Sequence, residues 1–128
     1  MSAGAALAAA AIDALAALGL GGVYPGPPLQ AASPYAVVEC GAETDWGHKG
    51  GAGREIRLAV ILRDSGERPE RAQAFADVAE ATIEAGLEVE GWRLVTLALV
   101  RRRTLAEGRG GRIGWAVVIE YRARLLAE

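Results

Sequence analysis

Two stretches of this chain alternate between apolar and charged side chains, and this pattern limits the possible folds more than any other feature. In residues 54–63 the even positions are apolar, whereas in residues 113–124 the odd positions are apolar. Successive side chains of a β-strand point to opposite faces, so each stretch is expected to be a strand with one face in a core. The core positions expected are Ile56, Leu58, Val60 and Leu62 in the first stretch, and Ile113, Trp115, Val117, Ile119 and Tyr121 in the second.

Two other stretches have the spacing of amphipathic helices. Residues 3–20 are rich in alanine, the best helix former, and end in glycines. We interpret them as a structural helix rather than a targeting or membrane-spanning segment, because they contain Asp13 and follow no basic residue. A second helix is expected to begin near Pro69 and to end near Gly86. The packing residues expected are Leu7, Ala11, Ile12, Leu15 and Leu18 in the first helix, and Ala72, Phe75, Ala76, Ala79 and Ile83 in the second.

Two further extended runs complete the pattern. Residues 34–40 are expected to form the first strand of a hairpin, whose long loop spans residues 44–53. Residues 92–103 are apolar on both alternations, which is typical of a strand covered on both faces. The proline-rich residues 23–28 are expected to be a crossing loop. We therefore predict a single α+β domain over residues 1–128, with a four-stranded, mainly antiparallel sheet, two helices on one face and the order α-β-β-α-β-β.

The face of this sheet opposite the helices is expected to be apolar near its centre. Such a patch favours cover by a partner, most simply another copy of the chain. The alternative is a solvated face on which scattered apolar side chains are tolerated. The residues assigned to this face are Ala59, Ile61, Val95, Leu97, Leu99, Ala116 and Val118.

The residues that usually carry chemistry are few. A single cysteine excludes an internal disulfide, and Cys40 lies on the inward alternation of its strand, so we expect it to be a packing residue. Glu39, Glu43 and Asp45 are expected to form a solvated edge rather than an acid–base or cation site. The two glycine-rich loops join strands and precede no helix, so we expect neither to bind a phosphate. We predict no cofactor, no metal site and no enzymatic activity.

The charge pattern adds one local feature. The net charge of −2 gives no general attraction to nucleic acids or to acidic membranes. The run from Arg101 to Arg103, together with Arg109 and Arg112, is expected to form a basic tip at the last hairpin. Solvation of the strand ends, docking of an acidic protein and contact with nucleic acid all remain open for this tip.

A series of short motifs runs through almost the whole chain in a characteristic order. They are an N-terminal helix, Gly22-Val23-Tyr24-Pro25, Ser33-Pro34-Tyr35, Thr44-Asp45-Trp46, Gly53-Arg54-Glu55, Pro69-Glu70-Arg71 and Gly91-Trp92-Arg93-Leu94-Val95. In this order and spacing the chain resembles the phage tail-terminator or tail-completion family, found in siphophages and gene transfer agents. The last hairpin, with its residues 107–112, departs from the pattern of the family.

The resemblance implies a structural protein of the virion tail that is assembled in the cytoplasm of a bacterial host. It implies a homo-hexameric ring that caps the tail tube protein and joins it to the head–tail connector protein, with DNA only as passing cargo and no membrane partner. We predict subunit contacts through Ile61, Val95, Leu97, Leu99 and Val118. We predict contacts to a partner or to the lumen through Trp46, His48, Lys49, Arg54, Arg101, Arg103 and Arg109.

Two other interpretations stay open on the sequence alone. One is a small ligand-binding or enzymatic α+β domain, assembled as a dimer or trimer, with a site between chains that uses residues such as Glu39, Asp45 and His48. The other is a neighbouring neck or head-closure component of the same kind of particle.

Overall fold

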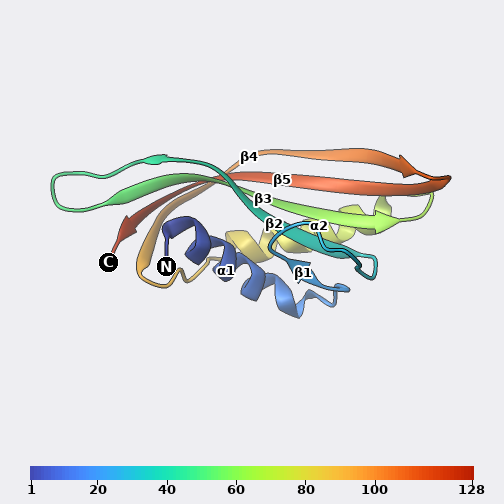
Figure 1. Cartoon of the computed structure of the whole chain (residues 1–128), viewed down its shortest axis with the longest axis horizontal. Coiled ribbons are helices and arrows are strands. Elements are labelled where there is room, and N and C mark those ends of the chain that lie inside the picture. Colours follow the sequence, from blue (N-terminus) through green and yellow to red (C-terminus); the bar gives the residue numbers. More distant parts are fainter.

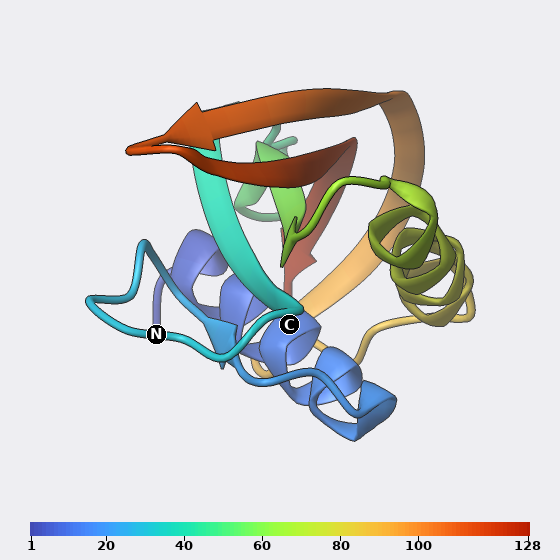
Figure 2. The same cartoon turned by 90° about the vertical axis from the view of Figure 1, so that its right-hand side faces the viewer.

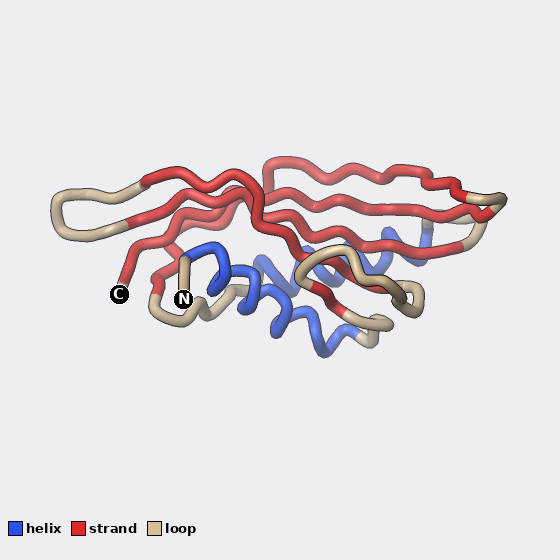
Figure 3. Tube along the Cα trace, in the orientation of Figure 1, coloured by secondary structure: helices blue, strands red, loops and turns tan.

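A five-stranded mixed sheet with two helices packed on one of its faces makes up the structure, a computed structural model (Figures 1 and 3). It describes the backbone of residues 1–128 and every side chain except that of Arg109. The helices are α1 (Ala3–Leu15), which continues into a short 3-10 turn η1 (Ala16–Leu18), and α2 (Glu70–Glu84). The strands are β1 (Val23–Tyr24), β2 (Tyr35–Asp45), β3 (Gly53–Ser65), β4 (Trp92–Arg109) and β5 (Arg112–Ala127).

The strands lie in the order β1-β2-β3-β5-β4. All neighbours are antiparallel except β1, which pairs in parallel with Ala36 and Val37 of β2. The predicted α+β class and the two helices on one face are confirmed, but the predicted count of four strands is wrong. The fifth strand lies in the segment that we predicted to be a crossing loop. It is only two residues long because Pro25, which lacks an amide donor, follows directly.

The core lies between the helices and the concave face of the sheet, which curves around them (Figure 2). The alternation predicted for residues 56–62 is confirmed, since Ile56, Leu58, Val60 and Leu62 are all buried. On β5 the pattern holds from Val117 to Tyr121 and continues to Leu125, whereas Ile113 at the hairpin tip is exposed. Both helices have mostly alanines toward the sheet, and these small side chains let the helix backbones approach it closely. Ser2 caps α1 by accepting the amide of Ala5 at 3.2 Å.

Strand β4 differs most from its prediction. It runs on to Arg109, so the three arginines predicted at a tip lie in the middle of a strand. Two bulges, between Leu94 and Thr96 and between Leu99 and Arg101, each insert one residue opposite β5. The hairpin closes through Gly110 and Gly111, both with positive φ, as a two-residue turn of this hand requires. The convex face of β4 carries the exposed side chains of Arg101 and Arg103, so the chain alone does not cover both faces of this strand as predicted.

The hairpin of β2 and β3 continues beyond the helices as an arm, which extends to one side of the molecule in Figure 1. Its strands bend where a bulge interrupts the register between Cys40 and Glu43. Residues 46–52 form the loop at its end, shorter than the predicted span of 44–53 because β2 reaches Asp45. The arm therefore presents a short loop on two long paired strands.

Candidate assembly surfaces

The tip of the arm holds two of the residues predicted to meet a partner, His48 and Lys49. His48 and Gly51 face each other in an isolated bridge, and Nδ1 of His48 accepts the amide of Gly50 at 2.9 Å. Lys49 lies exposed at the turn between them. The histidine thus orders the loop, and the lysine is left to carry positive charge at its end.

Two contacts that involve arginine hold the arm where its strands meet the loop. The ring of Trp46 lies half-buried under the guanidinium of Arg124, whose Cζ is 5.5 Å from the ring centroid. Nε of Arg54 donates to Oε2 of Glu43 across the hairpin at 2.8 Å. Two residues predicted to contact a partner, Trp46 and Arg54, therefore also brace the arm from within the chain.

The convex face of the sheet brings together two of the predicted subunit contacts. Ile61 and Val118 are directly opposite each other on β3 and β5, and both are half-exposed. Ala59 adjoins them, whereas Ala116 is buried. Around this small patch, carboxylates and guanidiniums form pairs, including Glu120 with Arg101 at 3.0 Å and with Arg103 at 3.6 Å. The face is thus less apolar than predicted.

Leu97 does not belong to that face. Its register opposite Ala123, a core residue, places it on the helix side, where it packs against the core. Val95 and Leu99 are both 44% exposed, and Val100 is 45% exposed. The bulges shift the alternation of β4, so the assignment of Leu97 to the same face as Ile61 is wrong. The assignment of Leu99 to that face is wrong as well, because Leu99 lies opposite the core residue Tyr121. Val95, Leu99 and Val100 form an exposed apolar stretch along the strand.

The three consecutive arginines of β4 do not act as one cluster. Arg101 and Arg103 reach Glu120 on the convex face, whereas Arg102 lies opposite Ile119 on the helix side. There its guanidinium donates to Asp77 at 2.7 Å, to Glu80 at 3.1 Å and to the carbonyl of Gln73 at 3.1 Å. Arg102 therefore fastens β4 to α2. The side chain of Arg109, also predicted to meet a partner, lies outside the described part of the structure.

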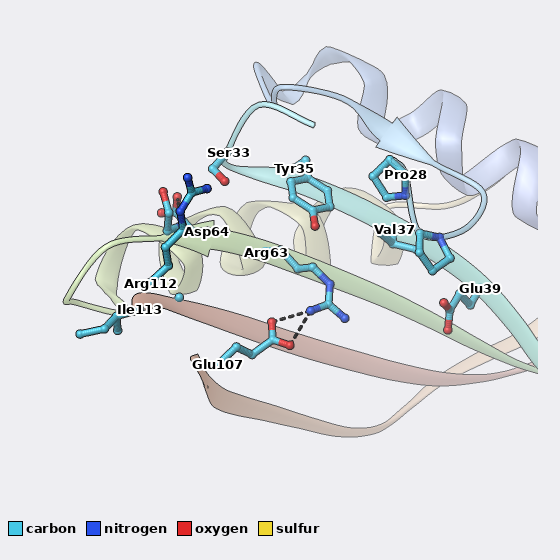
Figure 4. A pocket seen from close by; sticks show the side chains of 13 residues that line it. Pro28, Ser33, Tyr35, Val37, Glu39, Arg63, Asp64, Glu107, Arg112 and Ile113 are labelled. Carbon is cyan, nitrogen blue, oxygen red and sulfur yellow. Dashed lines mark hydrogen bonds and ion pairs between the residues drawn. The ribbon is translucent and has the colours of Figure 1, made fainter. Parts of the chain in front are cut away.

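An open groove of about 490 Å³ lies on the convex face between the proline-rich loop and the ends of β3 and β5 (Figure 4). Nη1 of Arg63 donates to both carboxylate oxygens of Glu107 in its wall, at 2.6 Å for Oε2. Because this arginine and this glutamate neutralise each other, neither is positioned as an acid or base for a ligand. The lining residues labelled in Figure 4 are Pro28, Ser33, Tyr35, Val37, Glu39, Arg63, Asp64, Glu107, Arg112 and Ile113.

The groups with shifted pKa values are structural. Arg71 donates two hydrogen bonds to Asp64, and these hold the pKa of that carboxyl below its usual range. Burial raises the pKa of the Cys40 thiol, which donates to the carbonyl of Gly4 at 3.4 Å as expected of a packing residue. Among the described side chains, no group of three or more His, Cys, Asp and Glu could hold a metal ion. Within the described chain, neither helix is long and apolar enough to cross a bilayer.

Two exposed apolar residues, Leu29 and Val100, are not among the contacts predicted from the sequence. Leu29 is fully exposed on the loop between β1 and β2, and Val100 lies at a bulge of β4. The signal available for Leu29 was its position directly after Pro27 and Pro28, in a loop segment that these prolines stiffen.

Comparison with known proteins finds similarity along almost the whole chain. The family model described as "Tail completion protein gp17" matches residues 4–126. Among solved structures, a chain of "Virion of native gene transfer agent (GTA) particle" is similar, with a TM-score of 0.76, 24% sequence identity and coverage of 98% of each chain. That likeness shows the same fold. No curated protein matches the chain.

Proposed function

The chain belongs to the tail completion protein gp17 family, and we propose that it is a structural protein of a phage-like virion tail, where it forms a homo-hexameric ring. In this proposal the ring terminates the tail tube and then joins it to the head–tail connector. The tube protein and the connector protein are its partners, and DNA passes through as cargo.

The observation that carries this proposal is the extent of the family match. It covers residues 4–126, so it includes both helices, most of every strand and the arm, rather than a single motif. The described fold provides surfaces for assembly, and in its open groove the carboxylate of Glu107 is paired with Arg63. A structural role accords with both features.

Two parts of the chain suit the two kinds of contact that such a ring makes. Ile61 and Val118 on the convex face, with Val95 and Leu99 on β4, are proposed to contact neighbouring subunits. The arm, with Trp46, His48, Lys49 and Arg54, is proposed to reach the tube, the connector or the lumen, together with Arg101, Arg103 and Arg109. An arm built on two paired strands holds its end in a defined position, which docking at a fixed point requires.

The test is to delete the gene in its source strain and to examine the particles by negative-stain electron microscopy, with plasmid complementation as the control. Overlong, unjoined tails beside filled heads would support tail termination. Tails of normal length that fail to join would instead indicate a neck or head-closure role. Normal particles in normal numbers would overturn the proposal, and a ligand site between chains would then be the next candidate.

A further inference from the structure

The sheet ends in two long free edges. On one side β1 covers only Ala36 and Val37, so β2 has no strand beside it from Glu39 to Asp45 in the described structure. On the other side β4 is the last strand along its whole length, Trp92–Arg109. Free edges of this length invite pairing with another chain unless something covers them. The strand order places β3 and β5 between β2 and β4.

These two edges carry opposite charges. Strand β2 contains three carboxylates, Glu39, Glu43 and Asp45, all exposed, and no lysine or arginine. Residues 92–103 contain four arginines and no carboxylate. On β2, Glu43 is neutralised by Arg54, which leaves Glu39 and Asp45 without an ion pair among the described side chains. On β4, Arg102 is neutralised by α2, but Arg93 has no ion pair among the described side chains, and Arg101 and Arg103 share a single glutamate. A surplus of positive charge therefore remains on one edge and a surplus of negative charge on the other.

Exposed apolar side chains accompany both sets of charges. On β4 they are Val95, Leu99 and Val100, each nearly half exposed. On the opposite side Leu29 projects from the proline-rich loop, and this loop lies next to Glu39, because Pro28 and Glu39 line the same groove (Figure 4). An apolar centre with charges around it is the usual composition of a protein interface.

We propose that a second copy of this chain docks head to tail, with the β2 edge of one copy against the β4 edge of the next. The β2 edge is Leu29, Glu39, Glu43 and Asp45, and the β4 edge is Arg93, Val95, Leu99, Val100, Arg101 and Arg103. Two β2 edges, or two β4 edges, repel each other, which disfavours a symmetric dimer. A contact between unlike surfaces generates a ring when its rotation closes. This inference rests on the proposed function and identifies the contact that builds its ring. It assigns Arg101 and Arg103 to that contact rather than to the tube, the connector or the lumen.

The test uses two charge-reversed variants of the full chain. One carries Glu39→Lys and Asp45→Lys, and the other carries Arg93→Glu and Arg103→Glu; all four positions are exposed, so folding should be retained and is checked by circular dichroism. Sedimentation velocity over a dilution series measures association. We expect wild type to associate, each variant alone to associate about 100-fold more weakly or worse, and an equimolar mixture to recover association because each variant supplies a partner for the other. Matched controls reverse an exposed charge in the loop before α2, away from both edges, at Glu67 in one variant and at Arg68 in another, and should behave as wild type.

Three results would overturn the inference. Wild type that stays monomeric at every concentration would remove the contact, and variants that associate as strongly as wild type would show that other surfaces form it. An equimolar mixture of the two variants that does not recover association would exclude the pairing of unlike edges. The particle phenotype of the gene deletion is scored separately, so a failed contact and a failed tail role are distinguished.

Discussion

Arg71 reaches from the first turn of α2 to Asp64 at the end of β3 and binds both of its carboxylate oxygens. Its Nη2 lies 2.6 Å from Oδ1 and its Nε lies 2.7 Å from Oδ2. Asp64 is only 5% exposed, whereas the guanidinium faces water. The pair fixes α2 to the strand that precedes it, so that the helix begins at a defined place under the sheet.

Replacing Arg71 with alanine should lower the free energy of unfolding by about 2 kcal/mol, because a buried carboxylate then loses its charged donor. The matched control is Arg68→Ala, which removes only an exposed pair with Glu70 at 3.6 Å and should cost less than about 0.5 kcal/mol. Urea unfolding at neutral pH measures the free energy of unfolding of both variants. Equal midpoints for the two variants would show that the Asp64 contact contributes nothing.

The same pair predicts a pH dependence with a definite sign. The pKa of Asp64 is lower in the folded chain than in the unfolded chain, where it is about 3.9. The contribution of the ionised Asp64 carboxylate to the free energy of unfolding is therefore complete above that value. It is lost as the pH falls through the lowered pKa of the folded chain. We expect the stability difference between wild type and Arg71→Ala to shrink as the pH is lowered below about 4. A difference that grows on acidification would contradict this assignment.

Arg102 is expected to matter for stability and its neighbour Arg101 much less. Arg102→Met removes donors to Asp77, Glu80 and the Gln73 carbonyl, and should cost about 1–2 kcal/mol. Arg101→Met removes one exposed pair with Glu120 and should cost less than about 1 kcal/mol. Thermal unfolding of the two variants, measured side by side, tests this difference in stability. A larger loss of stability for Arg101→Met than for Arg102→Met would refute the division of the arginines between two faces.

The sequence predicted the core well because burial on one face imposes strict alternation. Every even position from Ile56 to Leu62 is buried as expected, as are the alanines that line α2. Alternation in the sequence indicates only which side chains share a face as long as the strand is regular. Where a strand has bulges, the face of each side chain depends on the register with the partner strand. The bulge after Leu94 moves Leu97 to the helix side, and nothing in residues 92–103 signals that shift.

Non-local contacts account for the other differences. Strand β1 exists only through its pairing with residues 36 and 37, and two residues carry no periodicity of their own. The separation of Arg102 from its neighbours depends on the position of α2 under the sheet. For the assembly surfaces, the sequence indicated the loop residues and the apolar excess. It could not show that acidic and basic strands would lie at opposite edges, because that follows from the strand order.

Gly53, the residue at which β3 begins after the loop of the arm, should not tolerate a side chain. A Cβ there would lie 2.5 Å from the carbonyl oxygen of Trp46 and 2.8 Å from a methyl carbon of Leu126, so Gly53→Ala should cost about 1–3 kcal/mol. Gly51→Ala, two residues away, is the control, because its Cβ would have no neighbour within 4 Å. Chemical denaturation compares the free energies of unfolding of the two variants, and equal values would mean that the chain is loosely packed where the loop meets the strands of the arm.

The end of the arm should be needed for joining of tails to heads more than for folding. Lys49→Ala removes an exposed charge and should leave stability unchanged within about 0.5 kcal/mol, while Trp46→Ala gives up the stacking of Arg124, worth about 1 kcal/mol. We therefore expect the double variant to fold but to restore few joined particles when it complements the gene deletion. Joined and unjoined particles are counted by electron microscopy, with Arg68→Ala as the control for an exposed cation far from the arm. A folded double variant that restores joining to the wild-type level would show that the arm meets no partner, and the docking role would then fall to the sheet edges.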